Sequence, residues 1–135
     1  MSGFGSFGAR AYVSIGVETG VSTSSPHALI LMLYDGALES LRKAIGCIQA
    51  QDPMGKTQAV SRATRIIDEG LRASLDHKAG GDLSAQLNAL YDYMCRRALQ
   101  AGIDGDAGAL DEVVQLLDGL RDAWVSIQPR TQAAA

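Results

Sequence analysis

The sequence has few of the residues that build zinc sites, sheets or membrane spans. Its two cysteines, Cys47 and Cys95, form no CxxC or CxxxC motif, so zinc and redox chemistry have little support. No apolar run approaches the roughly 18 residues that a membrane-spanning helix needs, and no basic cluster followed by an apolar core opens the chain. Aromatic residues make up only 5%, and Leu and Ala outnumber the β-branched residues. We therefore expect a helical protein of the reducing cytoplasm, without membrane insertion.

Clustered positive charge is also lacking. The net charge is -3, and no basic cluster is larger than an adjacent pair such as Arg96-Arg97. A nucleic-acid-binding surface needs a basic stripe that meets several phosphates, so we expect no nucleic-acid partner.

Apolar residues recur with a helical period in the first half of the body. Ser25-Pro26 is a typical N-cap followed by a first-turn proline, and the pattern predicts a helix from there to about Ala50. Residues 51–55 break this helix, because Pro53 clashes with a preceding helical turn. A second helix is predicted over residues 56–78, with Gly80-Gly81 ending it.

The second half repeats the pattern twice. Asp82 is the predicted N-cap of a third helix, which has the seam Leu83, Leu87, Leu90, Met94 and Ala98. Residues 102–108 then reverse the chain, and a fourth helix carries the seam Leu110, Val113, Leu117, Leu120, Trp124 and Ile127 before Pro129.

Four amphipathic helices with short connections predict an all-α fold, an antiparallel up-down four-helix bundle over residues 25–128. Residues 1–24 are rich in Gly, Ser and Thr yet carry apolar side chains. We expect them to form a mobile or short-helical segment that lies against the bundle in some states. Residues 129–135 are expected to be a disordered tail.

Motifs for catalysis and for cofactor binding are absent or lack their context. Gly3, Gly5 and Gly8 spell GxGxxG, but no strand can precede them, so a dinucleotide site is not expected. The glutamates lack the Glu-x-x-His pairs of bundle metal sites. His27 and His77 have no nucleophile or carboxylate partner in the sequence, and capping or surface roles suit them better. We expect no enzyme, no metal and no cofactor.

Apolar surface beyond the main seams indicates a binding role. The first helix carries a second row, Ile30, Leu33, Ala37 and Ala44, about 80° from its main seam. Broad burial within the bundle and an external groove are both compatible with this row. Small residues of the second helix could form a groove floor, and tyrosines of the third helix could form its walls. The predicted groove residues are Ile30, Leu33, Ala37, Ala59, Ala63, Ile66, Tyr91 and Tyr93.

Several ordered segments resemble FliS, the family of flagellin export chaperones. They begin with Ala11-Tyr12 and continue with residues 21–26 (VSTSSP), 31–38 (LMLYDGAL), 74–76 (SLD), 80–83 (GGDL), 90–94 (LYDYM) and 120–124 (LRDAW). Each segment alone is weak, but together they follow the order and spacing of the family over residues 11–128.

The resemblance implies a helical bundle that holds the C-terminal segment of flagellin in the cytoplasm, prevents premature polymerisation and delivers it to the flagellar type III export gate. It also implies that the N-terminal segment covers the cargo site, through Tyr12, Ile15 and Val21, and that Tyr12 docks at an export-gate protein. The alternative is a homodimeric helical adaptor whose extra apolar row forms the dimer interface.

Overall fold

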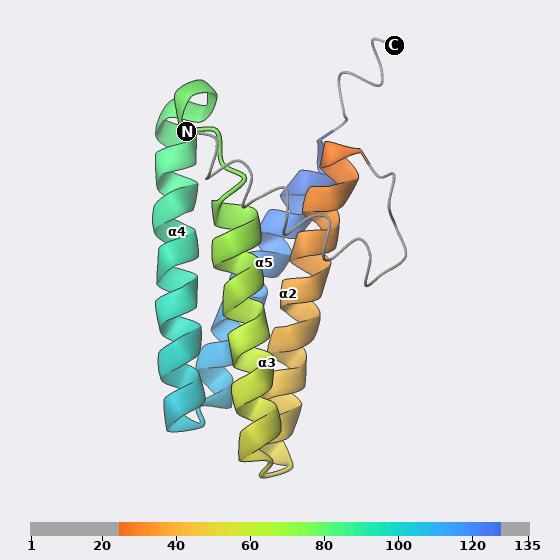
Figure 1. Ribbon diagram of the computed structural model, residues 1–135, viewed down its shortest axis with the longest axis vertical. Coiled ribbons are helices and arrows are strands. Elements are labelled where there is room, and N and C mark those ends of the chain that lie inside the picture. Colours follow the sequence, from red (N-terminus) through yellow and green to blue (C-terminus); the bar gives the residue numbers. More distant parts are fainter. Residues whose placement is uncertain (1–24, 128–135) are drawn as a thin grey trace.

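The computed structural model describes residues 25–127, which form four antiparallel helical rods (Figure 1). They are α2 (Pro26–Gln49), α3 (Pro53–Arg65) continued by the π-helix η1 (Ile66–Arg72), α4 (His77–Asp104) and α5 (Ala107–Ser126). Each rod packs against the next along the chain, and α5 packs against α2, which closes the ring. The predicted all-α four-helix bundle is confirmed. The segments predicted for residues 1–24 and 129–135 lie outside the described residues.

Each of the helices α2, α3, α4 and α5 begins where a side chain caps the first turn. Ser25 accepts a hydrogen bond from the Ala28 amide at 3.2 Å, ahead of a first-turn proline, as the sequence predicted. Asp52 accepts from the Gly55 amide at 3.0 Å, so α3 starts at Pro53 and includes three residues that we expected in the break. Asp106 caps α5 after Gly105, whose left-handed conformation ends α4.

The boundary between the second and third rods differs from the prediction. Asp76, and not Asp82, is the N-cap of α4, because its carboxylate accepts from the Lys78 and Ala79 amides at 3.1 and 3.0 Å. Gly80-Gly81 therefore lies inside α4, where Gly81 has a φ of 53° and kinks the helix. The second rod ends at Arg72, and its last seven residues form the π-helix η1.

The second apolar row of α2 is buried inside the bundle, which corrects the expectation of an exposed row. Leu33, Ala37 and Ala44 are all 0% exposed. The small residues of α3 and η1 explain this burial, because they let the second rod approach α2 closely. A Cβ atom placed on Gly70 would come within 2.9 Å of Leu33 Cδ2, so a larger residue there would force Leu33 to shift.

Candidate functional site

At one end of the contact between α4 and α5, neither helix contributes a fully buried apolar side chain to the core. In α4 the buried apolar side chains begin at Tyr91, and in α5 they end at Leu117. The two helices run antiparallel, so the first half of α4 lies at the same end of the bundle as the second half of α5 (Figure 1). This end of the helix pair therefore has apolar side chains that the described residues cover only in part.

Five leucines line this part of the helix pair, and we call them the open apolar edge. None is fully buried; they are Leu83, Leu87 and Leu90 of α4, and Leu116 and Leu120 of α5. Leu83 is the most open, at 63% exposure. Burying such side chains is favourable, at about 25 cal/mol per Å² of apolar area. The open apolar edge is thus a surface suited to an apolar partner.

Helical spacing explains why these leucines line the contact between the two helices. Leu90 and Leu83 lie seven and fourteen residues before Arg97, so the three side chains share one face of α4. Arg97 reaches across to Glu112 of α5. Leu116 and Leu120 follow Glu112 at intervals of four residues and therefore share its face of α5.

A polar cluster closes the edge toward the middle of the bundle. Glu112 accepts a hydrogen bond from the Tyr93 hydroxyl at 2.5 Å and another from Arg97 Nε at 2.9 Å. These hydrogen bonds, from Tyr93 first and then from Arg97, lower the pKa of Glu112, and the bond to Glu112 raises the pKa of Tyr93. The cluster marks the point where the apolar surface ends and charged contacts join α4 to α5.

An aromatic contact joins α2 and α5 at the opposite end of the edge. The rings of His27 and Trp124 stack with their centroids 4.9 Å apart. Trp124 Nε1 donates to the His27 carbonyl at 2.9 Å, and His27 Nε2 bonds the Trp124 carbonyl at 2.9 Å. This contact fixes residue 25, where residues 1–24 join the bundle, close to the end of α5.

The predicted groove residues fall into two groups. Six are buried in the core: Leu33, Ala37, Ala59, Ala63, Ile66 and Tyr91. The Tyr91 hydroxyl lies 2.7 Å from that of Tyr34, so the two side chains satisfy each other inside the bundle. Ile30 is partly buried, and Tyr93 is 38% exposed in the polar cluster. Contact of these residues with flagellin stays a prediction, and Tyr12, Ile15 and Val21 lie outside the described residues.

Sequence reasoning assigned most of the open apolar edge to the core. Leu83, Leu87, Leu90 and Leu120 were read as parts of buried seams, because periodicity shows which face of a helix is apolar but not whether a neighbour covers it. Leu116 carried the one available signal. It lies beside the seam of α5 and not on it. An apolar residue outside the seam indicates apolar surface beyond what the core contact uses.

The described part of the chain holds no grouping of three or more metal-binding side chains. Over residues 25–127, no helix is both long and apolar enough to cross a membrane.

A helical bundle with a row of partly exposed leucines has a surface of the kind that proteins use to bind other polypeptides. The model of the family described as "Flagellar protein FliS" matches residues 8–131. The chain is 45% identical to the flagellar secretion chaperone FliS of Salmonella typhimurium over 91% of both chains. It is 43% identical to the Escherichia coli protein of that name, over 87% of this chain and 86% of that one. The Bacillus subtilis protein is 40% identical, over 79% of this chain and 78% of that one.

This chain belongs to the FliS family of flagellar secretion chaperones. It is a chaperone and not an enzyme, and it takes part in flagellar export.

Proposed function

We propose that this protein is a cytoplasmic chaperone that binds the C-terminal segment of flagellin, prevents its premature polymerisation and delivers it to an export-gate protein. The family supplies the export role. The open apolar edge is the single structural observation that supports cargo binding, because its leucines present apolar surface to a partner. An amphipathic segment that folds on binding can bury its apolar face on such a surface.

The predicted groove residues contribute to this function in two ways. Ile30 and Tyr93 are accessible and contact the cargo directly. The six buried residues contribute indirectly, because their packing sets the positions of the helices that carry the open apolar edge. Close packing makes the core responsive to a change of even one methylene, so substitutions there weaken cargo binding through the shape of the bundle.

Residues 1–24 cover the open apolar edge in the free protein, and cargo displaces them. His27 and Trp124 place the start of α2 at the end of α5, and a chain of that length can span up to about 80 Å. The edge from Ile127 to Glu112 covers only about 22 Å of helix, so reach is no obstacle. In this two-state scheme Tyr12, Ile15 and Val21 leave the bundle when cargo binds, and Tyr12 then reaches the gate.

Deletion of residues 1–20 tests the cover. Flagellin binding should become stronger or stay unchanged, because the competing segment is removed. Calorimetry measures the affinity, and a large loss contradicts the cover.

Copurification tests the assignment of the cargo. The protein should recover intact flagellin from a cell extract but not flagellin that lacks its C-terminal segment. Equal recovery of both contradicts the assigned cargo site.

Homodimerisation is the second candidate, because two copies could also bury their open apolar edges against each other. Light scattering distinguishes the two. A stable dimer that persists in the presence of the flagellin segment supports the adaptor function and contradicts the chaperone function.

A further inference from the structure

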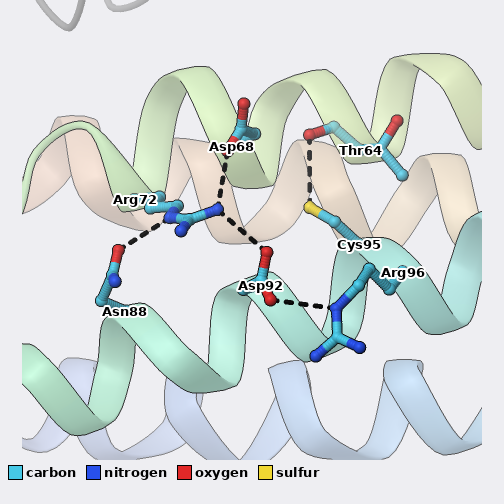
Figure 2. Close-up of polar contacts among 7 residues, drawn as sticks. All are labelled: Thr64, Asp68, Arg72, Asn88, Asp92, Cys95 and Arg96. Carbon is cyan, nitrogen blue, oxygen red and sulfur yellow. Dashed lines mark hydrogen bonds and ion pairs between the residues drawn. The ribbon is translucent and has the colours of Figure 1, made fainter.

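Arg72, the last residue of η1, joins the second rod to α4 (Figure 2). Its Nε donates to Asn88 Oδ1 at 2.7 Å, and its Nη1 donates to Asp92 Oδ1 at 3.3 Å. The same Nη1 also reaches Asp68 of η1 at 3.3 Å. The planar guanidinium therefore spans both helices with several donors at once, which a single ammonium group does less well.

The contact with Asn88 falls on the half of α4, residues 77–90, that carries the open apolar edge, and Asp92 lies just beyond that half. Asn88 lies between Leu87 and Ala89, one turn beyond Ser84. Within residues 25–127, the bond from Arg72 to Asn88 is the only side-chain hydrogen bond that another helix makes to residues 77–90. Their other side-chain hydrogen bonds all go to Asp76, the cap of the same helix.

Apolar packing holds this half of α4 only weakly. Ser84 is its one buried residue, and its leucines are exposed or partly buried. Gly81, with its φ of 53°, separates the first turn from the rest of the helix. Segments with few buried contacts open at a lower free energy than the core, so the position of this half depends heavily on its few polar contacts.

The π-helix places Arg72 at this point. Ile66, Ile67, Gly70 and Leu71 all face the core, and the wider π turn lets them do so together. Arg72 follows Leu71 directly and leaves the core on the side of α4. Its side chain is 30% exposed, and Asp68 and Asp92 on either side hold it over the helix contact.

We propose that Arg72 is a positioning residue, a tether that holds the leucine-bearing half of α4 against the second rod and so sets the position of the leucines for a guest. The link to a guest rests on the proposed function, whereas the tether itself is a property of the free protein.

Arg96 provides a matched control, because it bonds the other oxygen of the same carboxylate (Figure 2). Arg96 Nε lies 2.9 Å from Asp92 Oδ2, closer than Arg72 lies to Asp92, but both residues belong to α4. Distance alone predicts that Arg96 matters more. The tether predicts the reverse, because only Arg72 joins two helices.

Hydrogen exchange of the free protein tests the tether in Arg72→Gln and Arg96→Gln. In R72Q the amides of residues 84–90 should exchange about tenfold faster, since hydrogen bonds of charged groups contribute on that scale. Those of residues 109–117 should not change, and R96Q should match the unaltered protein. Equal acceleration in both variants, or none in R72Q, overturns the proposal. Should R72Q fail to fold, Asn88→Ala removes only the Nε bond and should accelerate the same amides by a smaller factor.

Calorimetry with the C-terminal segment of flagellin tests the link to cargo. R72Q should change the affinity by at least about threefold while R96Q leaves it unchanged. Faster exchange in R72Q with unchanged affinity overturns its positioning role. Absence of binding to the unaltered protein contradicts the proposed function instead, and the exchange measurement still decides whether the tether exists.

Discussion

Glu112 is the residue at which the open apolar edge ends and charged contacts between α4 and α5 begin. Hydrogen bonds from Tyr93 and Arg97 lower its pKa from the ordinary value of 4.5. The ionised form is therefore favoured in the folded state. The stability that it contributes is present above pH 4.5 and is lost as the pH falls through the lowered pKa.

Tyr93→Phe should raise the pKa of Glu112 toward its ordinary value, because it removes one of the two donors to the carboxylate. An NMR pH titration of the Glu112 carboxyl measures the change. Arg97→Gln, which removes the other donor, should shift the pKa in the same direction. An unchanged pKa in both variants contradicts the polar cluster.

The two cysteines should differ in reactivity. Burial, with Asp68 as a second cause, raises the pKa of Cys95 to about 12, and its Sγ lies 3.7 Å from the Thr64 carbonyl that it faces (Figure 2). At pH 8 about one Cys95 thiol in 10⁴ is ionised, so iodoacetamide should leave it unmodified. Cys47 lies in a surface depression beside the turn between α2 and α3 and should be alkylated. Mass spectrometry of the digested protein checks this, and equal labelling of both contradicts the burial of Cys95.

Among the elements, the contact between α2 and η1 depends on a glycine. Gly70→Ala would bring Cβ to 2.9 Å from Leu33 Cδ2. Leu33 is 0% exposed and has no space to move into. Such overpacking costs about 1–3 kcal/mol, which exceeds or offsets the gain in helix propensity of about 1 kcal/mol. We expect a net loss of up to about 2 kcal/mol in the free energy of unfolding, measured with urea.

Gly119→Ala is the matched control for that substitution. Gly119 lies within α5, and no atom stands within 4 Å of a Cβ placed on it. The substitution should stabilise the protein by about 0.5–1 kcal/mol, because alanine favours the helix more than glycine. Equal stabilisation by both substitutions contradicts the close packing of η1 on α2.

Local sequence signals predicted the elements well where a single cap was available. Ser25-Pro26 marked the start of α2, and the turn over residues 102–108 contains the cap of α5, Asp106. Pro53 was expected to lie in the break between two helices, whereas it opens α3. The boundary near Asp76 was missed because the sequence offers two capping aspartates, Asp76 and Asp82, with two glycines between them. Local propensity does not decide between such alternatives, since the tertiary structure selects one of them.

The candidate site was harder to predict, because exposure depends on how the helices meet. The sequence left two alternatives for the second row of α2, burial or an external groove, and the approach of η1 and α3 buries Leu33 and Ala37. The leucines of α4 and α5 were expected to be buried, yet they are partly open. In both cases the apolar face of the helix was predicted correctly. The pattern of a single helix does not show how closely the neighbouring helices approach it, and that approach decides whether the face is buried.

At the scale of the whole molecule, the two ends of the bundle differ. One end carries the open apolar edge, and both the start of α2 and the end of α5 lie there, joined by His27 and Trp124 (Figure 1). At the other end Ile103 protrudes from α4 with 77% exposure. The cargo site that we propose lies at the first end, although apolar residues are exposed at both.

The most direct test compares the two ends in one calorimetric titration with the C-terminal segment of flagellin. Leu83→Ala and Ile103→Ala each shorten an exposed apolar side chain of α4, at 63% and 77% exposure, so neither should disturb the core. The account predicts that L83A weakens binding by about fivefold or more, since the cargo would cover a leucine that is largely exposed, and that I103A binds like the unaltered protein. Unchanged binding by L83A, or equal weakening by both variants, would contradict it.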